Sequence, residues 1–259
     1  MRPKIAIPVP SSQESEYVER ARPQYLAAIE QSGGEAVVIG LEQSSTEIAK
    51  QLAFCHAALL PGSGADVDPQ KYGAPRHPKT VEADVLRDAA DELLLQDAHN
   101  LRKPIFGICY GLQSLNVWRT GTLVQDIPSQ IKTTVNHAAG RTVVRAHRAR
   151  IDPFSGFARM LHRDPEIGAH LQEAAHELNA FDFEINSSHH QSADVIGVGL
   201  RISARCPEDN VVEALEGTAP GHFVMAVQWH PERSYDDEPL SRALFRAFIK
   251  SAAAYQGTK

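Results

Sequence analysis

Short apolar runs alternate with helical patterns through the first 109 residues, and this alternation limits the possible folds more than any other feature of the sequence. Apolar residues recur at helical spacing over 17–31, 46–54 and 84–100. Around these segments lie four near-continuous apolar runs, "KIAIPVP" (4–10), "EAVVIG" (35–40), "HAALL" (56–60) and "KPIFGIC" (103–109). Strands that are apolar throughout and separated by helices are typical of a parallel sheet with helices on both faces.

The second half has a different pattern. Closely spaced strand-like runs follow one another without long helices between most of them: "RTVVRAH" (141–147), "LRISARC" (200–206), "NVVEAL" (210–215) and "HFVMAVQWH" (222–230). Some of these strands should therefore pair antiparallel. A helical stretch over 157–178, broken at "RDPE", and a last helix over 240–255 complete the pattern.

The sequence contains no internal repeat, low-complexity tract or Gly/Ser linker that would mark a domain boundary. A chain of 259 residues is long enough to bury one large core. We therefore predict a single domain over residues 1–259. Its predicted fold class is α/β, a layered sandwich around a mixed, mostly parallel central sheet.

Composition and charge argue against several classes of function. The formal net charge of −6 and the pI near 6.0 give no reason to expect nucleic acid or an anionic membrane as a partner. Three cysteines, Cys55, Cys109 and Cys206, lie far apart, which indicates free thiols in a reducing compartment. The chain start forms no signal-peptide core, and no later run approaches the ~20 apolar residues of a membrane span. We expect a cytoplasmic protein.

The strongest functional signal is "GICYG" at 107–111. Gly107 and Gly111 flank Cys109 in the G-x-nucleophile-x-G pattern of a tight strand-to-helix corner, where glycines relieve crowding. A thiol at a helix N-terminus faces unpaired backbone N–H groups and the positive end of the helix dipole, and both stabilise a thiolate. The N–H of Tyr110 would point toward a developing oxyanion. The pentapeptide alone does not distinguish such a nucleophile from a cysteine that packs under a turn.

A histidine and a carboxylate follow the last predicted strand in "VMAVQWHPERS". Residues i and i+2 of an extended backbone project to the same side, and Pro231 favours an extended conformation at His230. Glu232 can therefore bond to Nδ1–H of His230 and leave Nε2 free to face a thiol, as in a catalytic triad. The alternative is an exposed strand-end histidine beside a solvated carboxylate.

The two motifs predict one site because the carboxyl ends of strands frame the crevice of an open α/β sheet. A glycine turn, "LLPGSGAD", follows the third strand and belongs to the same edge. The backbone N–H groups of Gly62 and Ser63 could complete an oxyanion hole opposite Tyr110. A simple connecting loop is the alternative for this turn.

The chain resembles a class I glutamine amidotransferase-type domain over nearly its full length. Four motifs carry the resemblance in the family's order: "LLPGSGADVDP", "PIFGICYGLQSLNV", "INSSHHQ" and "VVEALEG…HFVMAVQWHPE". Within that superfamily, "GADVDPQKYG", "RDAADELLLQDA", "GTLVQDI" and "NSSHHQS" are similar to the γ-glutamyl-γ-aminobutyrate hydrolase branch, peptidase family C26. Two departures concern the leaving group: Tyr110 stands where this branch commonly has arginine, and "WRTG" replaces a stretch of small residues after "LNV".

The resemblance implies a flavodoxin-like three-layer sandwich and a Cys–His–Glu triad that hydrolyses γ-glutamyl amides through a γ-glutamyl thioester. By position, Cys109 would be the nucleophile, His230 the base and Glu232 the orienting acid. The N–H groups of Tyr110 and of the Gly62–Ser63 turn would bind the oxyanion. The alternatives are a glutaminase subunit that delivers ammonia to a partner synthase, and a non-catalytic binding protein on the same fold.

The paired histidines of "SSHHQS" raise the question of a metal. Adjacent side chains of an extended chain point in opposite directions, and no cysteine or acid spacing completes a zinc site. Family likeness instead favours His190 and Gln191 as part of the pocket wall, and we predict that they bind substrate together with Gln113. We expect no metal and no cofactor.

The predicted partner is a small γ-glutamyl substrate. The resemblance also makes a homodimer reasonable. The helical stretch over 157–178 is longer than the family pattern needs, and covering the site and forming a subunit contact both stay open as its role.

Overall fold

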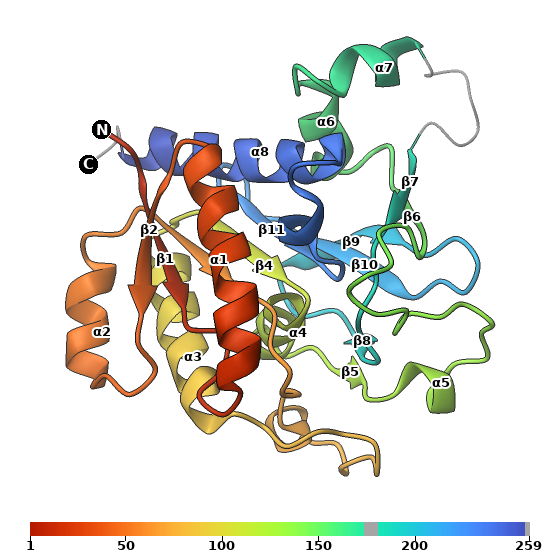
Figure 1. Cartoon of the computed structure of the whole chain (residues 1–259), viewed down its shortest axis with the longest axis horizontal. Coiled ribbons are helices and arrows are strands. Elements are labelled where there is room, and N and C mark those ends of the chain that lie inside the picture. Colours follow the sequence, from red (N-terminus) through yellow and green to blue (C-terminus); the bar gives the residue numbers. More distant parts are fainter. Residues whose placement is uncertain (174–180, 257–259) are drawn as a thin grey trace.

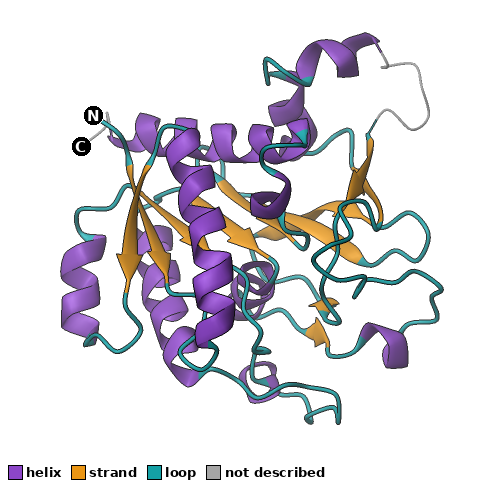
Figure 2. Ribbon diagram, in the orientation of Figure 1, coloured by secondary structure: helices purple, strands orange, loops and turns teal. Residues whose placement is uncertain are grey.

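A nine-stranded mixed sheet runs through the residues that the computed structural model describes, 1–173 and 181–256 (Figures 1 and 2). Its order is β2-β1-β3-β4-β11-β10-β9-β6-β7, and a small second sheet pairs β5 with β8. The strands are β1 (Lys4–Pro8), β2 (Glu35–Ile39), β3 (Ala57–Leu60), β4 (Ile105–Ile108), β5 (Leu123–Val124), β6 (His147–Ile151), β7 (Asp182–Ile185), β8 (Ser192–Ala193), β9 (Leu200–Arg205), β10 (Val212–Gly217) and β11 (Val224–Val227).

Helices cover both faces of this sheet, as the predicted layered sandwich requires (Figure 2). They are α1 (Ser15–Gln31), α2 (Ser45–Leu52), α3 (Val85–Asn100), α4 (Tyr110–Trp118), α5 (Ile127–Gln130), α6 (Gly156–His162), α7 (Gly168–Glu173) and α8 (Pro239–Gln256), with 3-10 turns η1 (Pro69–Tyr72) and η2 (Pro231–Ser234). None of the helices in the described ranges combines the length and apolarity that a bilayer crossing requires.

The parallel part of the sheet is the part that the alternating pattern predicted. β2, β1, β3, β4 and β11 are parallel neighbours in that order. Along β1, Ile5 and Ile7 pack into a core with α1, α6 and α8, whereas Ala6 faces a second core with α2, α3 and α4. Alternate residues of a strand point to opposite faces, so a strand buried on both sides must be apolar throughout. The predicted fold class is confirmed.

The remaining strands, β10, β9, β6 and β7, extend this sheet in antiparallel pairs. The strand predicted over 141–147 is wrong in its bounds, because β6 begins only at its last residue, His147. Val143 and Val144 are exposed, and the Val143 N–H donates to Gly140 C=O in a turn. Two valines next to each other cannot both face a core from one strand face, and here neither does.

The helical stretch predicted over 157–178 divides where "RDPE" interrupts it. α6 ends at His162 and α7 begins at Gly168. The Arg163 and Asp164 N–H groups close the end of α6 by donating to Met160 and Leu161 C=O. α7 lies at the outer edge of the molecule in Figure 1. The rest of that predicted stretch, 174–178, lies outside the described residues.

Candidate active site

Cys109 lies in the corner between β4 and α4, with backbone angles φ 53° and ψ −105°. A non-glycine residue seldom adopts a positive φ, and such strain is concentrated at functional positions. The Cys109 N–H donates to Val227 C=O at 2.8 Å, and its C=O accepts from Leu112 N–H at 3.0 Å, so both neighbouring elements hold the strained residue. Cys109 is 6 % exposed, at the N-terminus of α4.

The two glycines around Cys109 allow the backbone to pack more closely than a side chain would permit. A Cβ on Gly111 would lie 2.2 Å from Leu60 C=O, and one on Gly107 would lie 2.8 Å from Gly111 C=O. Real Cβ atoms do not come this close to other heavy atoms, so only glycine fits at either position. The "GICYG" pattern is therefore needed to seat α4 against β3 and β4.

His230 follows the carboxyl end of β11, the strand beside β4, and Glu232 lies in the turn η2. The His230 Nδ1–H donates to Glu232 Oε1 at 2.8 Å, and both side chains are almost fully buried. Burial lowers the pKa of His230, but the Glu232 carboxylate outweighs it, and the pKa rises to about 9. Burial raises the pKa of Glu232, and the His230 ring outweighs it in turn, so that pKa is lowered.

Cys109 and His230 follow the carboxyl ends of the neighbouring strands β4 and β11, as predicted for one site. The Cys109 side chain is among the groups that raise the pKa of His230, after the larger effect of Glu232. Glu232 thus bonds to Nδ1 of the imidazole, and the Cys109 thiol lies near the same ring. This is the order of contacts in a nucleophile–base–acid triad.

Arg233 also reaches the free nitrogen of this imidazole. Its Nη2 lies 3.2 Å from His230 Nε2, and its Nη1 donates to Ser188 Oγ at 2.9 Å. A guanidinium group can only donate, so it bonds to Nε2 only when the ring is neutral. Arg233 correspondingly lowers the pKa of His230. The Arg233 side chain is 17 % exposed, which places it between the buried pair and solvent.

Asn186 fixes the backbone of His230, and the sequence argument did not identify this residue. Its Nδ2 donates to His230 C=O at 2.8 Å, and its Oδ1 accepts from His230 N–H at 2.9 Å. One amide side chain thus satisfies both polar groups of the residue that bears the imidazole. The "INSSHHQ" motif contains Asn186, but its spacing from His230 gave no sign of the contact.

The glycine turn after β3 lies against the same histidine. A Cβ on Gly62 would lie 2.9 Å from His230 Cε1, so this residue must be glycine for the ring to sit here. The Gly62 N–H donates to Tyr25 Oη at 3.0 Å and is therefore engaged within the protein. Among the described residues, nothing accepts a hydrogen bond from the N–H groups of Ser63 and Tyr110.

A buried arginine of α3 supports this turn. Arg87 is fully buried, and its guanidinium donates to Pro10 and Pro61 C=O at 2.7 and 2.5 Å. Its Nε donates to Asp91 at 2.8 Å, and its guanidinium lies 4.9 Å from the centre of the Tyr110 ring. The Arg87 guanidinium thus contacts the segments that follow β1 and β3 as well as Tyr110, the residue after Cys109.

Of the three predicted substrate contacts, only His190 reaches partly into solvent. Its nitrogens donate to Asp66 and Asp126, and the hydrogen bond with Asp66 is the main cause that raises the pKa of His190. Gln113 and Gln191 are almost fully buried, and their amides donate within the protein. Substrate binding by these three residues stays a prediction.

His189 points away from His190, as expected for adjacent residues of an extended segment. It enters a separate buried group with His137, His147 and Glu213 that could hold a metal ion. The other two cysteines lie in unreactive surroundings. Burial raises the pKa of Cys55 to about 11, and burial raises the pKa of Cys206 still further.

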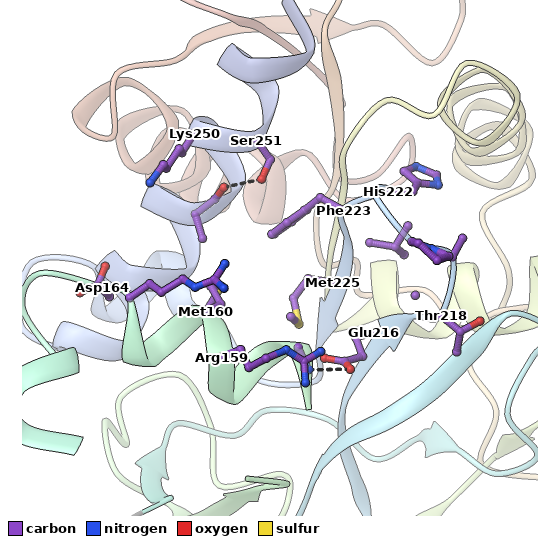
Figure 3. Close-up of a pocket in the computed structure, with 18 of the residues that line it drawn as sticks. Arg159, Met160, Asp164, Glu216, Thr218, His222, Phe223, Met225, Lys250 and Ser251 are labelled. Atoms are coloured by element: carbon purple, nitrogen blue, oxygen red, sulfur yellow. Dashed lines mark hydrogen bonds between the residues drawn. The ribbon is translucent and has the colours of Figure 1, made fainter. Parts of the chain in front are cut away.

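A large pocket lies at the other end of β11 (Figure 3). Its volume is about 820 Å³, and its walls include Met160, His222 and Phe223. These last two residues precede β11, whereas His230 follows its carboxyl end. The pocket is therefore separate from the Cys109–His230 pair.

Comparison with known proteins agrees with this arrangement. The family model for peptidase C26 matches residues 5–232. "Putative glutamine amidotransferase Rv2859c" of Mycobacterium tuberculosis is 36 % identical, over 90 % of this chain and 68 % of that protein. "Gamma-glutamyl-gamma-aminobutyrate hydrolase PuuD" of Escherichia coli is 31 % identical, over 87 % of this chain and 84 % of the relative.

Solved structures with the same fold include PurLQS from Thermotoga maritima, with a TM-score of 0.57, 15 % identity and coverage of 96 % of this chain and 99 % of the other. The glutaminase domain of Trypanosoma brucei CTPS has a TM-score of 0.55 and 17 % identity, with coverage of 97 % and 94 %. The fold comparison and the family model agree, and the chain belongs to the peptidase C26 family of glutamine amidotransferase-like hydrolases.

Proposed function

We propose that this protein hydrolyses γ-glutamyl amides with Cys109 as the nucleophile, His230 as the acid and base, and Glu232 as the orienting carboxylate. One observation carries the proposal. A cysteine held at positive φ is among the groups that raise the pKa of an imidazole whose Nδ1–H donates to a buried carboxylate at 2.8 Å. The family match and a relative named for γ-glutamyl-γ-aminobutyrate hydrolysis support the substrate class.

The reaction begins with the proton on His230 and the negative charge on the Cys109 sulfur. The thiolate attacks the γ-carbonyl carbon, and the carbonyl oxygen takes up the charge. His230 then gives its proton to the amide nitrogen, the C–N bond breaks, and the amine leaves a γ-glutamyl thioester. Water loses a proton to His230 and attacks the thioester, and glutamate leaves as the thiolate reforms.

The oxyanion requires hydrogen-bond donors that have no other acceptor. The N–H groups of Tyr110 and Ser63 meet this condition among the described residues. Gly62 serves the site differently from our expectation, because its N–H donates to Tyr25. Its contribution is the missing Cβ, which leaves room for the His230 ring.

Arg233 is the residue that we assign to the carboxylate of the γ-glutamyl group. It is charged, partly exposed and within 3.2 Å of the imidazole. A substrate carboxylate would form a stronger, charge-assisted pair with the guanidinium than the imidazole does. Binding would then draw Arg233 away from Nε2 and leave this nitrogen to the thiol.

A glutaminase that delivers ammonia to a synthase is the second candidate, and the name of the M. tuberculosis relative favours it. Both candidates use the same residues, so only the substrate distinguishes them. Turnover of glutamine that is fast only when a partner protein is added would support the second candidate. Turnover of γ-glutamyl amines by the isolated chain, with glutamine a poor substrate, would support hydrolysis.

The test uses the purified protein, a panel of γ-glutamyl amines, oligoglutamates and glutamine, and release of glutamate as the readout. The matched variants are Cys109→Ala, Cys55→Ala and Cys206→Ala. We expect the first to lose turnover and the other two to retain it, because Cys55 and Cys206 lie outside the site. No turnover of any compound by the wild-type protein would leave the non-catalytic alternative.

A further inference from the structure

Four buried side chains that the proposed reaction does not use converge in the antiparallel half of the protein. They are His137 of the loop before β6, His147 at the start of β6, His189 of the loop between β7 and β8, and Glu213 of β10. Their side chains are 2, 4, 2 and 0 % exposed, respectively. Polar groups this deeply buried need partners, and a buried carboxylate needs a cation.

The distances suit one metal ion. Glu213 Oε1 lies 3.3 Å from His137 Nδ1, 3.6 Å from His147 Nε2 and 3.9 Å from His189 Nε2. One ligand atom from each residue lies within 4.8 Å of all the others. Zinc bonds of about 2.0–2.2 Å in a tetrahedron place the ligand atoms roughly 3.3–3.6 Å apart. The four groups are therefore close to that arrangement already.

Each of the three histidines has one ring nitrogen that faces Glu213 and one that faces away from it. The hydrogen bonds of the nitrogens that face away show which tautomer each ring adopts. His137 Nε2–H donates to Asp209 at 2.9 Å, His189 Nδ1–H to Gln191 C=O at 2.9 Å, and His147 Nδ1–H to Arg148 C=O at 3.2 Å. These bonds assign the inward nitrogens as acceptors. A metal-bound histidine has the same kind of outer hydrogen bond.

The inward atoms therefore form a set of acceptors without a donor. His137 Nδ1, His147 Nε2, His189 Nε2 and both carboxylate oxygens of Glu213 have no hydrogen-bond partner among the described residues. One proton shared between His137 and Glu213 would satisfy a single contact and leave the remaining nitrogens unpaired. A divalent cation would satisfy one atom of every residue at once.

We propose that His137, His147, His189 and Glu213 form a closed, tetrahedral site for a divalent metal ion of the zinc type. Three imidazole nitrogens and one carboxylate oxygen are common zinc ligands, and a site with four protein ligands has a structural role. Asp209 holds His137 from outside, and it is itself held by Thr133 Oγ1 at 2.6 Å. The sequence-based expectation of no metal was based on local spacing, but the proposed ligands come from four separate segments.

The site would fix the loop that borders the proposed active site. His189 belongs to the loop that also carries Asn186, which bonds to the backbone of His230, and Ser188, which bonds to Arg233. A metal at His189 would attach this loop to β6 and β10. Metal binding would therefore stabilise the fold, and its main readout does not depend on turnover.

The test begins with tag-free protein that has been dialysed against a chelator, and zinc and cobalt are added separately. We expect one zinc per chain with submicromolar affinity, a higher melting temperature, and visible absorption bands of tetrahedral cobalt. Asp209→Asn should weaken binding by about 10–100-fold, as loss of an outer hydrogen bond does at other metal sites.

The matched variants are His189→Asn and His190→Asn, which alter neighbouring residues on opposite sides of one segment. His189→Asn and His147→Asn should each abolish tight binding, while His190→Asn should bind zinc like the wild type. Circular dichroism checks that each variant is folded before titration. The proposal is overturned if folded wild-type protein takes up no zinc, or if His189→Asn and His147→Asn bind it as tightly as the wild type.

Discussion

Replacing Glu232 by glutamine tests the electrostatic part of the proposed site. Burial lowers the pKa of His230, the Glu232 carboxylate more than compensates, and the pKa is about 9. Relative to an ordinary value of about 6.5, this corresponds to about 3 kcal/mol in favour of the imidazolium form. The variant keeps the burial and Arg233, which both lower the pKa of His230, so the pKa should fall to its ordinary value or below.

The protonated fraction of His230 at pH 7 should then fall from about 99 % to about 24 % or less. Because kcat/KM reports the free enzyme, its alkaline limb should move from about pH 9 to about pH 6.5 or lower. The assay is the pH profile of kcat/KM with a chromogenic γ-glutamyl anilide. Arg233→Met should move the limb upward, because Arg233 lowers the same pKa. Glu47→Gln, a change in the exposed cap of α2, should leave it unchanged.

The same pKa predicts how stability depends on pH. A group whose pKa is raised by folding contributes its full stability below the unfolded value, and it loses that stability as the pH rises through the folded value. The wild-type protein should therefore lose up to about 3 kcal/mol between about pH 6.5 and pH 9 from His230. In Glu232→Gln this loss should be absent from urea unfolding. An alkaline limb that stays at the same pH in Glu232→Gln would refute the assignment of Glu232.

Further substitutions test other parts of the site. Cys109→Gly and Cys109→Ala should both be inactive. In urea, the free energy of unfolding of Cys109→Gly should exceed that of Cys109→Ala by about 1 kcal/mol, because glycine adopts a positive φ without strain. Equal stability of the two variants would contradict strain at this corner. Asn186→Ala should lower kcat by about 10–100-fold with little change in KM, because Asn186 orients His230 without contacting substrate. A change confined to KM would instead assign Asn186 to substrate binding. Arg87→Met should lower the free energy of unfolding in urea by about 3–5 kcal/mol, because it leaves Asp91 buried and unpaired. The double variant Arg87→Met/Asp91→Asn should recover part of this loss. Full stability of Arg87→Met would contradict the role of Arg87.

The parallel half of the fold was predictable because its strands are buried on both faces. That burial makes β3 and β4 apolar throughout, and likewise β1 after Lys4, and the helices between them have a clear period. The positions of Cys109, His230 and the Gly62 turn followed from the same reasoning, because each comes after the carboxyl end of a parallel strand. The sequence therefore located the candidate site before any side-chain contact was known.

The contacts between loops could not be predicted in the same way. β7 and β8 span only four and two residues, which is too short for a sequence period to mark them. Asn186 reaches His230 across 44 positions of sequence, and the proposed metal ligands come from four segments. Local patterns contain no information about such pairs, whose geometry arises only when the antiparallel strands assemble.

The central claim is that a γ-glutamyl group is carried on the sulfur of Cys109, and acid-quenched mass spectrometry tests it most directly. Wild-type protein is mixed with a γ-glutamyl amide, quenched during turnover and digested for peptide mapping. We predict that the peptide containing Cys109 gains the mass of one γ-glutamyl group and loses it on brief treatment with hydroxylamine, while Cys109→Ala shows neither the adduct nor turnover. Turnover without an adduct on Cys109, or turnover that persists in Cys109→Ala, would contradict the claim.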